Sequence, residues 1–134
     1  KLHYSSVDPL PENTQCFQLD DGTVFYYKYN VPQNIYLTSA DGLIYAKLPS
    51  GHIVSISAHG NALYFNTTMG KIYRATYTDN TIEISFVRNR QLLESVSPSG
   101  VCSLNGKYYP MSVDPNSAES NLVEISNELS GGAV

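Results

Sequence analysis

Few residues of this chain could perform chemistry, and their spacing builds no recognisable catalytic set. The three histidines, His3, His52 and His59, lie at no spacing typical of a metal site or of a nucleophile with its base. His52 and His59 follow turn-forming residues, which favours surface positions. No phosphate-binding loop, nucleophile elbow or dinucleotide fingerprint is present. We therefore expect no catalytic residue, no metal and no cofactor.

Two cysteines, Cys16 and Cys102, lie 86 residues apart, a spacing that matches no metal site. In an oxidising compartment they would form one disulfide closing a long loop, and two free buried thiols are the alternative. The chain begins at Lys1, which fits either removal of a signal peptide or simple truncation. Tyrosine is abundant, 11 of 134 residues, tryptophan is absent and 15% of residues are charged. This composition favours a β-rich secreted protein.

The charge balance argues against nucleic-acid binding. The net charge is −4 and the pI about 5.2, whereas nucleic-acid affinity comes mainly from neutralising phosphates. Four basic residues could still form a local patch, although solvated strand and loop charges explain them more simply. These residues are Lys71, Arg74, Arg88 and Arg90. No apolar run approaches the length of about 18 residues that suggests a membrane span, so no membrane partner is expected.

The elements that would position these residues are mainly antiparallel strands. Apolar and polar residues alternate through Tyr73–Thr78 and Ile82–Val87, the pattern of strands with one buried face. Asp79-Asn80 suits a two-residue hairpin turn, because both residues tolerate positive φ. The resulting register predicts an apolar face of Tyr73, Ala75, Tyr77, Ile82, Ile84 and Phe86, opposite a polar face of Arg74, Thr76, Glu83 and Ser85.

The segment from Asn30 to Leu48 fits two structures. A helix is indicated because Leu37, Ala40, Ile44 and Leu48 share one helical face. A hairpin is indicated because Asp41-Gly42 could form its turn. In addition, NIYLTSADGLIYA (residues 34–46) weakly resembles NALYFNTTMGKIYRA (residues 61–75), at a spacing typical of propeller strands. Further strands are expected over residues 52–58, 62–67, 71–77 and 92–96, and a helix is possible within residues 112–134.

The stretch ISFVRNRQLLESVSPSG, residues 84–100, resembles the late strand-turn-strand segment of small fungal guanyl-specific ribonucleases. A strand ends at Phe86, a polar turn holds Asn89 and Gln91, and a cysteine follows Ser99-Gly100. CFQLDDGTVFYYKYN followed by VPQNIYLTSA is similar to the N-terminal hairpin and single helix of that fold. The closer likeness is to the RNase-like secreted effectors of powdery mildew fungi, and it covers roughly residues 16–102.

This resemblance implies an α+β fold: an antiparallel sheet with one helix, over residues 31–47, packed across it. It also implies one disulfide between Cys16 and Cys102. An all-β fold is the alternative. The chain would divide into an irregular arm (1–15), a ribonuclease-like domain (16–111) and a C-terminal tail or docking helix (112–134).

The resemblance also implies that the active site is lost. Alignment on Phe86 places Arg74 at the family's glutamate base, Glu83 at its arginine and Pro98 at its histidine acid. Without a general acid and a general base, no residue can transfer the protons that transphosphorylation requires, so we expect a pseudo-ribonuclease rather than an enzyme. The candidate binding surface is then Lys71, Arg74, Thr76, Glu83, Arg88 and Arg90.

The leading hypothesis is a monomeric, secreted fungal virulence effector. It would bind host proteins after delivery into a plant cell and be recognised by a plant immune receptor, with RNA as a weaker partner. One alternative is a secreted carbohydrate-binding propeller-like module, which would require an oligomer to close; the absence of tryptophan argues against a sugar-stacking site. Another is an inhibitor of a secreted enzyme such as lysozyme, because ISAHGNALYF resembles a Ser-Ala-Ser-Gly inhibitor loop in which His59 replaces the second serine.

Overall fold

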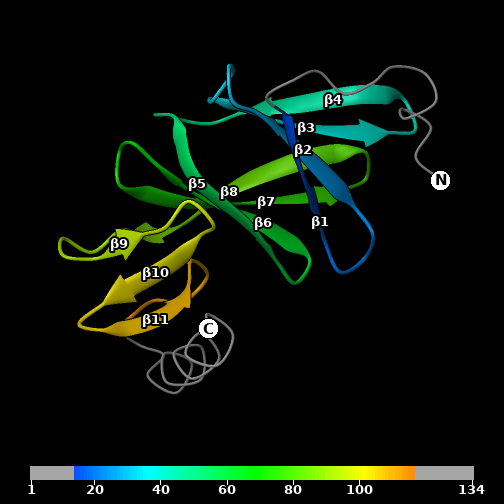
Figure 1. The fold of residues 1–134 in the computed structure, drawn as a ribbon. Helices are drawn as coiled ribbons and strands as arrows, with labels where there is room; N and C mark the ends of the chain where they lie inside the picture. Colours follow the sequence, from blue (N-terminus) through cyan, green and yellow to red (C-terminus); the bar gives the residue numbers. More distant parts are fainter. Residues whose placement is uncertain (1–13, 117–134) are drawn as a thin grey trace.

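A computed structural model describes residues 14–116, which form three antiparallel sheets and no helix (Figure 1). The N-terminal sheet has the strand order β1 (Thr14–Gln18), β2 (Val24–Lys28), β3 (Asn34–Ser39), β4 (Gly42–Lys47). The central sheet has the order β5 (Ile53–His59), β6 (Ala62–Thr67), β7 (Lys71–Thr78), β8 (Thr81–Asn89). The C-terminal sheet has the order β11 (Lys107–Pro110), β10 (Val101–Leu104), β9 (Ser95–Val96).

The α+β prediction is therefore wrong for the described residues, and the all-β alternative fits. Residues 31–47 hold the β3–β4 hairpin instead of a helix. Its turn is Ala40-Asp41, one residue before the expected Asp41-Gly42, and Gly42, at a φ of 108°, begins β4 opposite Ser39. Leu37 pairs with Ile44 across this hairpin, so both side chains share one face of the sheet. That shared face produces the same apolar spacing that suggested a helix. The helix expected within 112–134 and most of the predicted arm lie outside the described residues.

The predicted β7–β8 hairpin is confirmed in turn and register. Asp79 and Asn80 both have positive φ, 53° and 61°, and Ala75 pairs with Ile84 as expected. A β-bulge interrupts the pairing of β7 with β8 farther from the turn. Tyr73 pairs with Phe86 but Ile72 pairs with Arg88, so Val87 is the extra residue of β8. The extra residue changes the side-chain alternation of β8 and turns Arg88 toward the C-terminal sheet.

The main hydrophobic core lies between the N-terminal and central sheets. Strand β1 contacts β5 and strand β4 contacts β8, so the two sheets stack face to face with their strands in matching order. The N-terminal sheet contributes Phe17, Leu19, Phe25, Tyr27, Ile35, Leu37, Ile44 and Leu48. The central sheet contributes Ile53, Ile56, Ala58, Leu63, Phe65, Tyr73, Ala75, Tyr77, Ile82 and Ile84.

The C-terminal sheet packs on the opposite face of the central sheet. A second core joins Tyr64, Ile72 and Val87 of the central sheet to residues on and around β10 and β11, namely Val96, Cys102, Leu104, Tyr109, Met111 and Val113. The β9–β10 loop lies directly against β5. A Cβ atom added to Gly100, whose φ is 87°, would come within 2.6 Å of the Ser57 Cβ. Glycine at position 100 therefore permits this close approach.

The first strands of the three sheets are evenly spaced along the chain. The first strands begin at Thr14, Ile53 and Ser95, which are 39 and 42 residues apart, a spacing typical of four-stranded propeller repeats. The internal similarity seen in the sequence does not follow this repeat. It aligns β3–β4, the last hairpin of one sheet, with β6–β7, the middle hairpin of the next. Residues 14–116 contain no helix long and apolar enough to cross a membrane.

The predicted disulfide is wrong, because both cysteines are free. Cys16 is exposed on β1 of the N-terminal sheet, whereas Cys102 is buried on β10 of the C-terminal sheet. The central sheet separates the sheets that carry them. Their positions along the chain were compatible with a bridge, but the stacking order of the sheets is not.

Candidate binding pocket

A cavity of about 370 Å³ lies where the first strands of the stacked sheets come together. The N-terminal sheet contributes β1 and the end of β2, the central sheet contributes the start of β5, and the β9–β10 loop closes one side. The lining residues are Gln15, Tyr27, Tyr29, Ile53, Val54, Ile56, Pro98 and Ser99. A cavity of this size is typical of small-molecule sites.

Two tyrosines form the aromatic wall of the pocket. Tyr27 and Tyr29 lie two residues apart, so both side chains project from the same side of the chain. Their ring centroids are 5.3 Å apart with the planes at 89°, an edge-to-face pair. The Tyr29 hydroxyl donates to Gln15 Oε1 at 2.6 Å, and the Tyr27 hydroxyl donates to the Ile53 carbonyl at 3.3 Å. The rings are therefore held in place by contacts to β1 and β5.

The pocket lining is neutral. Among the residues from 14 to 116 that line it there is no aspartate, glutamate, lysine, arginine or histidine. Burial raises the pKa of Tyr27, and the neighbouring Tyr29 raises it further, so this phenol keeps its proton at physiological pH. The polar side-chain groups that the described lining offers are the amide of Gln15 and the hydroxyls of Tyr27, Tyr29 and Ser99.

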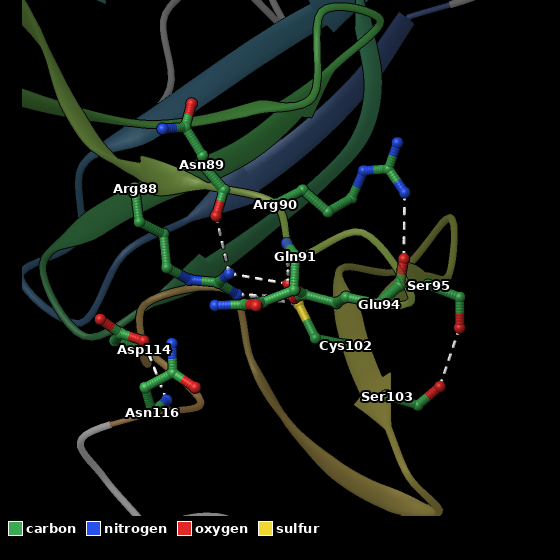
Figure 2. Close-up of polar contacts among 10 residues, drawn as sticks. All are labelled: Arg88, Asn89, Arg90, Gln91, Glu94, Ser95, Cys102, Ser103, Asp114 and Asn116. Carbon is green, nitrogen blue, oxygen red and sulfur yellow. Dashed lines mark hydrogen bonds and ion pairs between the residues drawn. The ribbon is translucent and has the colours of Figure 1, made fainter.

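A second cluster of polar groups is buried between the central and C-terminal sheets (Figure 2). Arg88 donates from Nη1 and Nη2 to the two carboxylate oxygens of Glu94, at 2.8 and 2.7 Å. The same carboxylate accepts the backbone N–H of Gln91 at 2.9 Å. Arg88 Nη2 also lies 3.6 Å from the Cys102 sulfur, and the guanidinium carbon is 5.7 Å from the Tyr109 ring centroid.

This cluster stabilises charge but offers no reactive group. Burial acts to raise the pKa of Glu94, yet the hydrogen bonds from Arg88 and Gln91 outweigh it and hold that pKa below its ordinary value. Burial, with the nearby Glu94 carboxylate, raises the pKa of Cys102 far above that of a free thiol. A buried thiol that stays protonated is a poor nucleophile. The cluster is therefore a structural clamp between two sheets.

No protein-family model, curated protein or solved structure matches this chain. The resemblance to ribonuclease-like effectors consequently stays an interpretation of the sequence, and the α+β fold that it implied is wrong.

The structure does not bring together the three positions aligned with a lost active site. Arg74 and Glu83 are exposed on the same face of β7 and β8, and no ion pair joins them within residues 14–116. Pro98 lies beside β5, at the opposite edge of the central sheet from β8.

The predicted binding surface is also divided. Arg74 and Glu83 share one face with the partly buried Thr76, whereas Lys71 and the exposed Arg90 lie at the end of the hairpin. Arg88 is buried in the clamp and is not available to solvent. Asn66-Thr67-Thr68 matches the N-glycosylation sequon, but Asn66 is 5% exposed on β6, so the folded domain does not present it for glycosylation.

The pocket residues Gln15, Tyr27, Tyr29 and Val54 were not identified from the sequence. The available signal was the spacing of Tyr27 and Tyr29, which places two aromatic side chains on one side of a strand end. The sequence does not reveal that β5 and the β9–β10 loop pack beside them.

Proposed function

We propose that this chain is a non-catalytic module that binds a neutral carbohydrate in the pocket lined by Tyr27 and Tyr29. The observation that carries this proposal is the combination of two fixed tyrosine rings with neutral polar groups in one cavity. Sugar rings present an apolar C–H face and a rim of hydroxyl groups. An aromatic wall suits the face, and amide or hydroxyl groups suit the rim.

The polar groups of the pocket support the same ligand class. Gln15 uses its Oε1 to accept from Tyr29 and keeps an amide NH₂ that can donate to a ligand hydroxyl. Ser99 adds a hydroxyl on the facing loop. Strands β1 and β5 are both sheet edges, so each has backbone groups that pair with no neighbouring strand. A neutral, hydroxyl-rich ligand can use all three kinds of group.

This proposal develops the propeller-like alternative rather than the effector hypothesis. The effector hypothesis depended on a ribonuclease-type sheet crossed by a helix, and that arrangement is wrong for residues 14–116. The lysozyme-inhibitor alternative stays a prediction, with His59 at the exposed β5–β6 turn. The missing tryptophan weakens sugar stacking less than expected, because two tyrosines provide the aromatic surface.

Replacing Tyr29 with alanine should weaken carbohydrate binding about tenfold or more, which corresponds to about 1.4 kcal/mol. The variant removes part of the aromatic wall and the partner of Gln15. Tyr29 is 54% exposed, so its loss should leave the melting temperature nearly unchanged. A glycan array of neutral oligosaccharides would identify the ligand, and isothermal titration calorimetry would give its Kd.

Tyr45→Ala is the matched control, because Tyr45 is a similarly exposed tyrosine (65%) that lies on β4 outside the pocket. Its Kd should stay within about twofold of the wild type. No binding to any neutral glycan, or equal losses from Tyr29→Ala and Tyr45→Ala, would argue against the proposal.

A further inference from the structure

Two leucines are displayed at the tip of the turn between β8 and β9. Leu92 and Leu93 occupy the central positions of a β-turn in which the Glu94 N–H donates to the Gln91 carbonyl at 3.1 Å. These two residues are 93% and 81% exposed, more than any other large hydrophobic residue described. The sequence predicted a strand from residue 92, but only Ser95 and Val96 are extended. Central turn positions are normally polar or glycine, so two exposed leucines are unusual there.

The turn that carries these leucines is held rigidly. Glu94 closes it by accepting the Gln91 N–H, and the same carboxylate is clamped by Arg88. Arg90 donates from Nη1 to the Glu94 carbonyl at 3.0 Å. Its backbone N–H donates to Gly70 at 2.7 Å, which brings the β6–β7 turn and its exposed Met69 alongside. The apolar tip is thus presented in one conformation, with little freedom to fold back.

The ends of the stacked sheets carry opposite charge. One end holds the turns β1–β2, β3–β4, β5–β6 and β7–β8. A 2.9 Å hydrogen bond from the Asp20 N–H to the Gly60 carbonyl joins the β1–β2 turn to the β5–β6 turn. We call it the acidic end, because its turns carry Asp20, Asp21, Asp41 and Asp79. The opposite end holds the other connections (Figure 1). We call it the basic end, because the strand ends there carry Lys28, Lys47, Lys71 and Arg90.

The leucine turn lies at the basic end. Backbone hydrogen bonds join the neighbouring connections at this end. The donors are the N–H groups of Ile53, Thr68 and Arg90, and the acceptors are the carbonyls of Pro32 (2.8 Å), His52 (2.9 Å) and Gly70 (2.7 Å), respectively. Among residues 14–116, Glu94 in the β8–β9 connection is the acidic residue at this end, and Arg88 forms an ion pair with it. Among the other described acids, Glu83 lies on β8 beyond the β7–β8 turn and Asp114 follows β11.

We propose that the basic end docks on an anionic membrane surface, with Leu92 and Leu93 inserted among the lipids. Aliphatic side chains that enter the interface and cations that face the headgroups are the two contributions that hold peripheral proteins on membranes. A protruding pair of leucines fits a deformable lipid surface. A protein partner would instead favour tyrosine, tryptophan or arginine in a complementary pocket. The expectation of no membrane partner rested on the lack of a spanning segment, which does not bear on surface docking.

Co-sedimentation with vesicles tests this proposal. The full chain should sediment with vesicles of equal parts phosphatidylcholine and phosphatidylserine, and much less with phosphatidylcholine alone. The double variant Leu92→Ser/Leu93→Ser should bind at least about tenfold more weakly, because it loses the inserted apolar area. Lys71→Gln should weaken binding in low salt, and raised salt should remove that difference.

Leu43→Ser is the matched control, because Leu43 is an exposed leucine (61%) next to the β3–β4 turn of the acidic end. Both serine variants should keep the wild-type melting temperature, and Leu43→Ser should bind vesicles like the wild type. The proposal is overturned if the wild type does not sediment, or if the double variant binds as well as Leu43→Ser. It is also overturned if the double variant changes only the self-association measured by light scattering, which would identify a protein contact.

Discussion

Replacing Glu94 with alanine should lower the free energy of unfolding by about 3–5 kcal/mol, because it leaves the buried Arg88 guanidinium without its counter-charge. The Glu94 side chain is fully buried and makes two hydrogen bonds to Arg88 and one to the Gln91 N–H. A domain of this size has a total stability of about 5–15 kcal/mol. The variant should therefore lose a large part of its stability, which urea unfolding followed by circular dichroism would measure.

Glu83→Ala is the control, because Glu83 is an exposed glutamate on β8, the strand that also carries Arg88. Its cost should stay under about 1 kcal/mol. The double variant Arg88→Met/Glu94→Leu should recover much of the loss, since it removes both charges and fills the space with apolar groups. Similar losses from Glu94→Ala and Glu83→Ala would show that the clamp is not buried as described.

The contribution of Glu94 should also depend on pH in a defined direction. Its pKa in the folded chain lies below the ordinary value of 4.5, so unfolding at low pH takes up a proton. The stability that Glu94 provides is then fully present above the ordinary pKa and is lost as the pH falls through the folded value. The difference between wild type and Glu94→Ala should accordingly narrow below pH of about 4.

Replacing Phe65 with alanine should cost about 3–5 kcal/mol, because it opens a cavity between the N-terminal and central sheets. Phe65 on β6 has no exposed surface and belongs to the main core. It pairs with Tyr73, which in turn pairs with Phe86, so the three rings form one row across β6, β7 and β8. Chemical denaturation measures the change in unfolding free energy.

Phe86→Ala is the comparison variant, because Phe86 lies at the solvent-exposed end of the same row of rings. Phe86 is 52% exposed and keeps an edge-to-face contact with Tyr73 at a centroid distance of 6.0 Å. Its loss should cost about 1 kcal/mol, the scale of one aromatic pair. The sequence predicted Phe86 on the apolar face of the hairpin and gave no sign that it would be half exposed. Equal costs for the two variants would mean that the N-terminal sheet does not cover β6 more fully than β8.

The sequence predicted those parts of the fold that local chemistry decides. The β7–β8 hairpin follows from Asp79-Asn80 and from alternation on either side, and its register is confirmed. The Asn30–Leu48 segment could not be decided in this way. Leu37 and Ile44 share a face in a hairpin as well as in a helix, so apolar spacing alone does not distinguish them. The family resemblance favoured the helix, which is wrong.

The sites depend on long-range packing and were mostly missed. Arg88 was expected on an open surface, but the bulge between Ile72 and Tyr73 turns it toward Glu94 in the β8–β9 connection. Leu92 and Leu93 were expected in a strand, because an apolar pair does not reveal that Glu94 closes a turn around them. Cys16 and Cys102 suggested a bridge for a similar reason: their separation along the chain says nothing about the sheet lying between them.

Nuclear Overhauser contacts around Tyr27 test most directly whether stacked blade-like sheets frame the pocket. The Tyr27 hydroxyl contacts the Ile53 carbonyl across the two sheets, and Pro98 lies in the same cavity. We therefore expect contacts from the tyrosine rings to Ile53 and Pro98, together with cross-strand contacts between Tyr36 and Tyr45. Helical chemical shifts over residues 34–47, with no contact between Tyr27 and Ile53, would contradict the stacked-sheet fold and the binding pocket that depends on it.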